Sequence, residues 1–195
     1  MREFLEDVGA WDAHGLAESR GWIERQLQAA SRVLYVHGNY LDQMRNKSAM
    51  AIAHSAVLFC PRTHAYFGHA RHPFLELLDA RINVALGTDS LASNPDLSIL
   101  EEMRFLWRQD VGRLSGGELL RLGTLNGAMA LGCERDTGSL APGKSADWIT
   151  VPLQGGSVDD PHDAIFVSSL PVRDVFIAGR CVVQGGRMTR PLAAD

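Results

Sequence analysis

The sequence predicts an α/β protein, with a parallel sheet covered by helices and a small β region at the carboxyl end. Short, fully apolar runs alternate with helical segments in the middle of the chain, a pattern typical of parallel sheets buried on both faces. After residue 134 the sequence becomes rich in turn formers and short β-type runs. In parallel α/β folds, functional side chains gather where the strands end, so the residues that follow each strand are candidates for a site.

Local residue types place the first elements. The expected strands are VLYV at residues 33–36, AVLFCP at 56–61 and INVALGTD at 82–89. The expected helices are 42–54 with Asp42 as N-cap, 73–80 with Pro73 in a favoured first position, and 97–110 with Asn94 or Asp96 as cap. The polar, histidine-rich segment at residues 62–72 is expected to be a loop.

The later elements follow from a change of pattern. Residues 115–132 are expected to form one more helix, with Ser115 near its start and Gly132 at its stop. Residues 138–151 are rich in turns and then β-type, and residues 172–188 predict a hairpin of VFIA and CVVQ joined by a Gly-Arg turn. We therefore expect a small β appendage at this end of the chain.

Composition narrows the class of protein. The chain has 195 residues, 46% hydrophobic and 22% charged, which fits one globular domain with at most a small addition. Its net charge of −4 favours neither a nucleic acid nor an anionic membrane as partner, and no apolar run reaches the roughly 20 residues of a membrane helix. Three widely spaced cysteines predict neither a disulfide framework nor a zinc knuckle, so we expect a reducing, cytoplasmic setting.

Asp89 and His37 are the leading candidates for chemistry. Asp89 follows an apolar strand, where a carboxylate is costly unless a cation or hydrogen bonds compensate it. It is therefore a metal ligand or general base, or else a cap or a loop carboxylate bonded to the backbone. His37 also ends a strand and is able to shuttle a proton, bind a metal or simply bond to a neighbouring carbonyl. We expect both side chains to lie at the same edge of the sheet, where the parallel strands end (the mouth of the sheet).

Each of the remaining polar candidates has an ordinary structural role as the alternative to a function. Among the loop histidines, His64 is nearest to a strand end and is the one expected to meet a substrate, whereas His64, His69 and His72 lack the spacing of a metal site. Arg62 is a candidate clamp for a substrate anion or a surface residue. Ser90 and Asn94 are candidate ligand contacts or turn and cap residues. Charges on the helix that follows are expected on a solvated face with i,i+3 pairing: Glu101, Glu102 and Arg104.

Five segments, taken together and in order, resemble the carboxyl-terminal half of the amidohydrolase superfamily: VLYVHGNYLD, AVLFCPRTHAYFG, INVALGTDSLASN, LNGAMALG and GSLAPGKSADWITV. The likeness covers roughly residues 1–188 and is greatest to the deaminase and chlorohydrolase branch, which includes guanine, adenosylhomocysteine and aminofutalosine deaminases. It implies a (β/α)₈ barrel whose sixth, seventh and eighth strands are the three apolar runs, joined to a small β-sandwich. By this resemblance residues 1–134 are a partial barrel, 135–190 are part of the sandwich, and 191–195 are a tail.

The resemblance also implies a reaction. In that branch a divalent ion, zinc or iron, activates a water that hydrolyses a C–N bond of a nitrogen heterocycle such as an aminopurine. Asp89 matches the family's metal-ligand Asp, which also relays the proton, and His37 matches the His that orients the attacking water or holds the substrate. A small-molecule substrate is then the expected partner.

The sequence departs from the family in the rest of the metal site. No two histidines are separated by one residue, and the family's further ligand His with its catalytic Glu is not found. We therefore expect the chain to begin after the fifth strand, to hold no metal stably alone, and to be inactive alone. A truncated reading frame, a wrong start codon and a split enzyme completed by an N-terminal half are the explanations considered, with a homo-oligomer also open. The alternative function is a non-catalytic interaction subunit or fold remnant that has lost metal binding.

Overall fold

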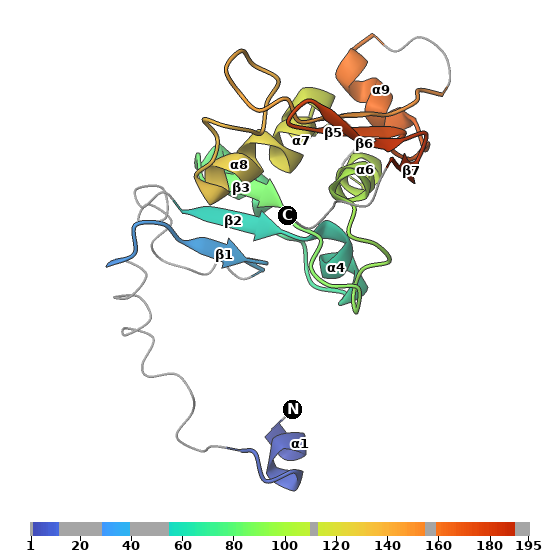
Figure 1. Cartoon of the computed structure of the whole chain (residues 1–195). Coiled ribbons are helices and arrows are strands. Elements are labelled where there is room, and N and C mark those ends of the chain that lie inside the picture. Colours follow the sequence, from blue (N-terminus) through green and yellow to red (C-terminus); the bar gives the residue numbers. More distant parts are fainter. Residues whose placement is uncertain (1, 12–28, 40–54, 110–112, 155–158, 190–195) are drawn as a thin grey trace, which may run out of the picture.

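Three parallel strands form the centre of the structure, a computed structural model that describes residues 2–11, 29–39, 55–109, 113–154 and 159–189 (Figure 1). The strands are β1 (Leu34–Val36), β2 (Ala56–Phe59) and β3 (Asn83–Leu86), in the order β1-β2-β3. Val36 pairs with Leu58, and Leu58 pairs in turn with Ala85, so all strands end at the same edge of the sheet. The three predicted strands and their parallel arrangement are confirmed.

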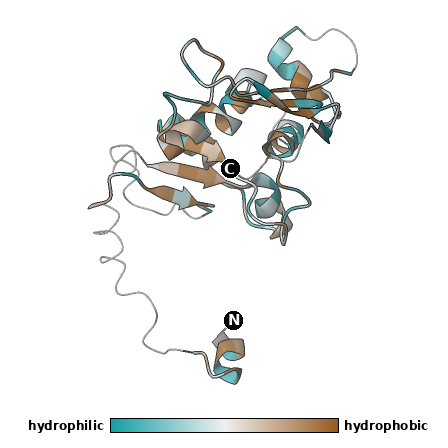
Figure 2. Ribbon diagram, in the orientation of Figure 1, coloured by the Kyte–Doolittle hydropathy of each residue, from teal (hydrophilic) through white to brown (hydrophobic). Residues whose placement is uncertain are grey.

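The first strand differs from expectation in its burial. Leu34 and Val36 are 37% and 56% exposed, although their apolar run predicts a buried strand. The reason is that β1 is at the edge of the described sheet and pairs only with β2 there. By contrast, β2 and β3 are hydrophobic along most of their length and are buried (Figure 2).

Residues 61–66 form a helix, α4 (Pro61–Tyr66), where the sequence predicts a loop. Pro61 begins this helix, as proline often does, because its fixed φ suits the first helical position and its missing N–H has no partner there anyway. The helix predicted at 73–80 is confirmed as α5 (Phe74–Asp79), with Pro73 at its N-cap rather than in the predicted first position. The helix predicted at residues 42–54 lies outside the described residues, and a short helix, α1 (Arg2–Asp7), precedes the sheet in sequence.

The helix after β3 is α6 (Ile99–Gln109), and its cap is neither of the residues predicted. The hydroxyl of Ser98 accepts a bond from the backbone N–H of Glu101 at 3.3 Å, which is the usual contact of an N-cap. Asp96 supports this turn from outside, because its carboxylate accepts the N–H of Ser98 at 2.8 Å.

The single helix predicted at 115–132 is two helices, α7 (Gly116–Gly123) and α8 (Leu125–Leu131). Ser115 forms a capping box with Glu118, and Gly132 ends α8 in the left-handed region at φ 75°, as predicted. The helix is interrupted at Thr124, which lies between α7 and α8. Two residues later, the Asn126 side-chain amide donates to the carbonyl of Val84 at 2.8 Å. This bond docks α8 on β3, a long-range contact that local sequence does not reveal.

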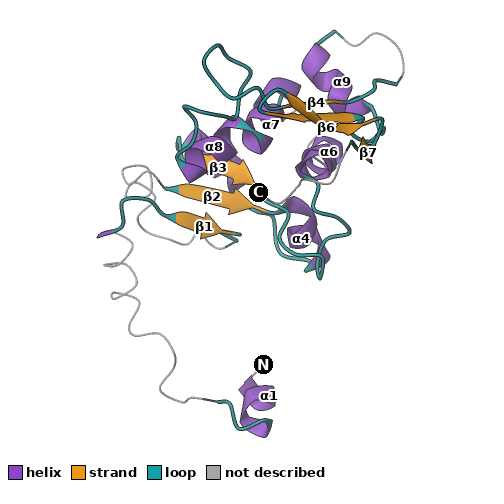
Figure 3. Ribbon diagram, viewed as in Figure 1, coloured by secondary structure: helices purple, strands orange, loops and turns teal. Residues whose placement is uncertain are grey.

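The carboxyl-terminal region is an antiparallel sheet accompanied by a helix (Figure 3). Its strands are β4 (Trp148–Thr150), β5 (Asp174–Ile177), β6 (Arg180–Gln184) and β7 (Arg187–Met188). The predicted hairpin is β5–β6, but its turn lies one residue earlier, at Ala178 and Gly179, both with positive φ. Helix α9 (Pro161–Val167) has no counterpart among the predicted elements, and it begins after Asp160, whose carboxylate accepts a backbone N–H in its first turn.

One apolar core joins these parts. Its buried side chains come from β2, β3, α5, α6, α7 and α9, and Phe166 carries the last of these helices into it. The core lies on one face of the parallel sheet and holds the strand ends, and the loops after them, in place. Within the described part of the chain, no helix is both long and apolar enough to cross a membrane.

Candidate active site

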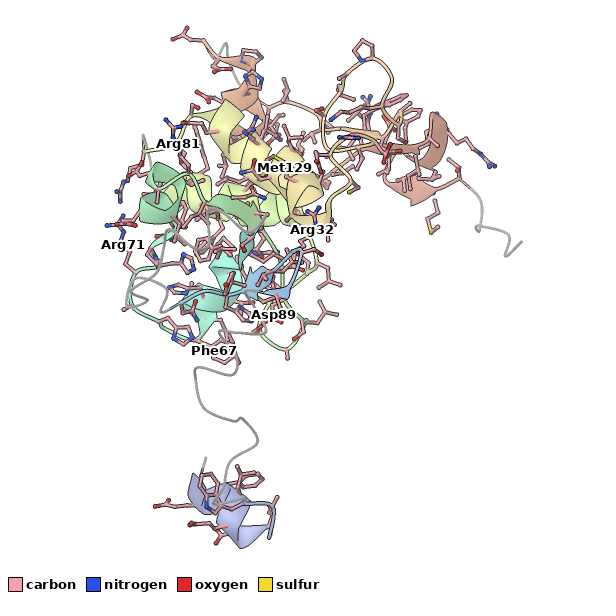
Figure 4. All side chains as sticks on the ribbon, turned by 90° about the vertical axis from the view of Figure 1, so that its left-hand side faces the viewer. Arg32, Phe67, Arg71, Arg81, Asp89 and Met129 are labelled. Atoms are coloured by element: carbon pink, nitrogen blue, oxygen red, sulfur yellow. The ribbon has the colours of Figure 1, made fainter. Side chains whose placement is uncertain are left out.

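His37 and Asp89 lie together where β1 and β3 end. The Nε2 atom of His37 is 3.9 Å from Oδ2 of Asp89, and both side chains are partly exposed. In Figure 4, Asp89 and Phe67 both lie in the lower part of the folded body, whereas Arg81, which precedes β3, lies in its upper part. The expectation that the two side chains share one mouth of the sheet is confirmed, and their chemical roles stay predictions.

Backbone conformation marks the same two residues. His37 has φ 65° and Asp89 has φ 58°, in the left-handed region that non-glycine residues rarely occupy. Such conformations cost free energy and persist where the surrounding structure enforces them, often at functional sites. The N–H of His37 still donates to the carbonyl of Leu58 at 2.8 Å, so the unusual backbone begins at the end of the ladder.

The donor atoms of this pair suit a divalent ion, but they are fewer than a complete set. A carboxylate and an imidazole are ordinary ligands of zinc and iron, and a catalytic zinc usually has three protein ligands. Within the described residues, no group of three or more His, Cys, Asp or Glu side chains is placed to hold an ion. The carboxylate and imidazole of this pair therefore fit part of a metal site, and the role of Asp89 as a metal ligand stays a prediction.

Cys60 lies beside this pair at the end of β2. Its thiol is buried, and burial followed by the negative charges of Asp89 and Glu102 raises its pKa to about 11. Its sulfur occupies space next to Gly87, where an added Cβ would lie 3.2 Å away. Cys60 is thus a neutral packing residue close to both carboxylates near the strand end.

His64 projects from α4, and each of its ring nitrogens lies close to an oxygen. Its Nδ1 lies 3.1 Å from the Asn39 side-chain oxygen, and its Nε2 donates to the carbonyl of Ala70 at 2.8 Å. Burial, the largest cause, lowers the pKa of His64. A substrate contact through Nε2 would have to replace the bond to Ala70, because a neutral imidazole carries one N–H.

His72 is buried next to the backbone of His37, although the sequence predicts a polar loop at this position. Its ring stacks on Phe59 with centroids 4.0 Å apart, and its Nε2 donates to the carbonyl of His37 at 2.6 Å. Its Nδ1 is buried and has no hydrogen-bond partner among the described residues. Desolvation by this burial lowers the pKa of His72 to about 4, so the ring is neutral at pH 7.

We expect the free energy of unfolding to fall as the pH drops from 6.5 toward 4. In this window the unfolded chain binds a proton at His72 that the folded chain does not, so protonation favours unfolding. The full shift corresponds to roughly 3 kcal/mol. NMR titration of the His72 ring gives a direct check, with the urea-unfolded chain as reference. A folded-state ring that titrates near 6.5 would contradict this expectation.

Arg62, Asn94 and Ser90 have different surroundings. The Arg62 side chain is only 12% exposed and pairs with Asp96 at 2.6 Å and Glu102 at 2.7 Å, so the alternative of a surface residue is wrong. The Asn94 amide is buried and donates within the protein. Ser90 is exposed in the loop of residues 88–96 that contains Asp89 (the Asp89 loop). Its hydroxyl accepts the N–H of Ala92. Of these three predicted substrate contacts, Ser90 is the most accessible.

The prediction that Glu102 and Arg104 lie on a solvated face is wrong. Glu102 is 0% and Arg104 1% exposed, whereas the expected i,i+3 pair of Glu101 with Arg104 is present at 2.7 Å. Helical spacing carries a signal for Glu102, because Leu106, four residues later on the same face, is buried. The residue type hides that signal, because charged side chains are rarely fully buried.

The sequence matches a known protein family over most of its length. The family model described as "Amidohydrolase family" matches residues 14–182. The chain belongs to the amidohydrolase family. This confirms the resemblance noted from the five sequence segments, and the neighbours that follow fit its deaminase and chlorohydrolase branch. The mixed α/β content agrees with the amidohydrolase fold.

Among curated proteins, the chain is 35% identical over 167 residues to a 5-methylthioadenosine/S-adenosylhomocysteine deaminase of Pelotomaculum thermopropionicum, covering 78% of this chain and 37% of that protein. Among solved structures, it is similar to a zinc-bound adenosine deaminase from Xanthomonas campestris, with a TM-score of 0.76, 27% identity, and coverage of 90% and 42%. It is also similar to atrazine chlorohydrolase from Arthrobacter aurescens TC1, complexed with zinc, with a TM-score of 0.76 and 28% identity. This match covers 90% of this chain and 40% of that one. The chain thus spans well under half the length of these amidohydrolases.

Proposed function

We propose that the whole protein is a metal-dependent amidohydrolase that removes the amino group of an adenine nucleoside such as S-adenosylhomocysteine or 5-methylthioadenosine. The observation that carries the proposal is the placement of Asp89 and His37, 3.9 Å apart at the carboxyl ends of parallel strands. The names of the relatives support the choice of substrate. Zinc in the related structures supports the choice of ion, with iron as the other candidate.

We further propose that the chain is the carboxyl-terminal portion of a (β/α)₈ barrel, with β1, β2 and β3 as its sixth to eighth strands. Residues 1–134 then belong to the barrel, 135–190 to a small β-sandwich, and 191–195 to a tail. The parallel order of the three strands and the antiparallel sheet that starts at Trp148 support this division. The missing part of the site would come from an N-terminal half.

The chemistry is a hydrolytic substitution at an sp² carbon. Asp89, together with ligands from outside the described residues, would hold a divalent ion, which would supply a water activated for attack at neutral pH. Asp89 takes the proton of the attacking water and passes it to the departing nitrogen. His37 hydrogen-bonds the water or the heterocycle and orients it. A C–O bond forms at C6 of the purine, the C–N bond breaks, and ammonia leaves.

Other groups at this edge are proposed to contact the substrate. Ser90 is exposed beside Asp89, and His64 on α4 lies 3.1 Å from the side chain of Asn39, which follows β1. Arg62 and Asn94 remain proposed contacts as well, although the bonds they make within the protein make a direct contact less accessible.

The protein as its own cells make it, loaded with zinc, is expected to release ammonia from S-adenosylhomocysteine and 5-methylthioadenosine. Dialysis against a strong chelator should abolish ammonia release, and added zinc should restore it, because the ion supplies the nucleophile at neutral pH. Coupled ammonia detection and the absorbance change from adenine to hypoxanthine measure the reaction. The intact mass of the same preparation shows whether the native protein is larger than the 21.3 kDa chain.

The 195-residue chain, purified separately and supplied with zinc, is the control. We expect it to release no ammonia, because its described residues supply one proposed metal ligand. Ammonia release by the native protein that does not respond to chelation would overturn the proposed role of a metal. No release with either nucleoside at full zinc occupancy would overturn the proposed substrate class.

A further inference from the structure

A fully buried carboxylate, that of Glu102, is linked to the candidate active site through Asn94, which bonds both to it and to Thr88. Glu102 is 0% exposed on α6, although an unpaired carboxylate in such a place would be very costly. The proposed chemistry gives it no direct part, because other residues lie between it and the mouth of the sheet. Its hydrogen-bond partners therefore indicate what it does.

Both oxygens of Glu102 are held by donors from two other segments. Oε1 accepts from Nε of Arg62 at 2.7 Å and from Nδ2 of Asn94 at 2.6 Å, and Oε2 accepts the backbone N–H of Arg62 at 3.0 Å. Charge-assisted bonds of this kind are short and roughly twice as strong as neutral ones. Glu102 thus binds the first turn of α4 and the loop after β3 to the same point on α6.

The bonds continue to both ends of the Asp89 loop. Asn94 uses its Nδ2 a second time and donates to the carbonyl of Thr88, the residue before Asp89, at 2.6 Å. Arg62 extends to the other end of the loop, where its Nη2 donates to Oδ1 of Asp96 at 2.6 Å. The loop is therefore fixed at Thr88 and at Asp96 by residues that both bond to Glu102.

Asp89 depends on such support for its position. Its backbone is in the left-handed region, which it would not keep by its own preference. Its carboxylate accepts a bond of 3.3 Å from Ser93, whose hydroxyl lies 3.0 Å from that of Thr63 on α4. The segments that Glu102 joins are thus the same ones that meet at the Asp89 side chain.

We propose that Glu102 is a positioning residue, which orients Asp89 toward the metal by locking the Thr88–Asp96 loop to α4 through Asn94 and Arg62. The inference rests on the proposed function and deepens it, because it assigns a role to residues that do not touch the ion. It also gives Asn94 a role other than substrate contact. Residues that support metal ligands typically change metal affinity or activity 10- to 100-fold when they are replaced.

The test uses the native protein with Glu102→Gln and, separately, Asn94→Ala. We expect zinc affinity without substrate, measured by competition with a chromophoric chelator, to fall roughly 10- to 100-fold in each. We expect kcat at saturating zinc and substrate to fall as well, with little change in KM. Asn94→Ala removes no charge, so it keeps the test available if Glu102→Gln does not fold.

The matched control is Glu101→Gln, on the same helix and with the same change of charge. It weakens the pair with Arg104 and lowers stability without touching the loop, so zinc affinity and kcat should stay as in the parent. Unchanged zinc affinity and kcat in Glu102→Gln and Asn94→Ala would overturn the positioning role. A raised KM alone in Asn94→Ala would also overturn it, in favour of substrate contact. If the parent protein neither binds zinc nor releases ammonia, the proposed function itself is contradicted. This outcome is distinct from a failure of the positioning role.

Discussion

Replacing Asp89 by Asn is expected to lower kcat/KM of the native protein by on the order of 1000-fold, the range observed when a general acid–base group is lost. Asn has nearly the same shape as Asp and tolerates the left-handed backbone at φ 58°, so the loop should keep its conformation. It carries no negative charge for a cation and cannot take a proton from water. The loss should therefore be chemical rather than structural.

Steady-state kinetics with S-adenosylhomocysteine measure this loss, and the zinc content of the purified variant measures metal binding. Asp79→Asn, at the exposed end of α5, is the matched control and should retain full activity. Activity within about tenfold of the parent in Asp89→Asn would mean that another group takes the proton, since a positioned acid–base residue contributes at least about 100-fold.

Replacing Arg104 by Met is expected to lower the free energy of unfolding by about 1–3 kcal/mol, as is typical when partly buried carbonyls lose a charged donor. The guanidinium is buried, donates to the carbonyls of Ile165 and Leu170, and pairs with Glu101. Methionine fills similar space but leaves those carbonyls without this donor. Since Ile165 belongs to α9, the variant should also loosen α9 from α6.

Urea unfolding of the native protein, followed by circular dichroism, measures the change. Arg108→Met is the matched control, because Arg108 lies one turn later on α6 and is exposed. We expect it to change stability by less than about 0.5 kcal/mol, as exposed positions usually do. Equal effects of the two substitutions would show that the Arg104 contacts contribute little to stability.

The local sequence determined the parallel strands, their order along the chain and the residues at their ends. Apolar runs that stop at a polar residue are short-range signals, and parallel topology brings their ends to one edge. The pairing of His37 with Asp89 is therefore predictable from the sequence alone. The stop at Gly132 and the cap at Ser115 are predictable for the same reason, because both depend on residues within one turn.

Other features required contacts between distant segments. Thr124 breaks a helix that local propensity would continue, and Asn126 then bonds to Val84, 42 positions away. Helix α4 takes the place of an expected loop, with the buried Glu102 accepting the N–H of Arg62 in its first turn.

Burial of charge was the feature that only the tertiary structure decided. The letters Glu-Glu-Met-Arg suit a solvated helix face, and a charged side chain is stable in the interior only if partners meet it there. Among those partners, Arg62 lies 40 positions from Glu102 and Ile165 lies 61 positions from Arg104, so these contacts exist only once the chain has folded. Local pattern thus located the candidate catalytic pair, and long-range packing decided what holds it in place.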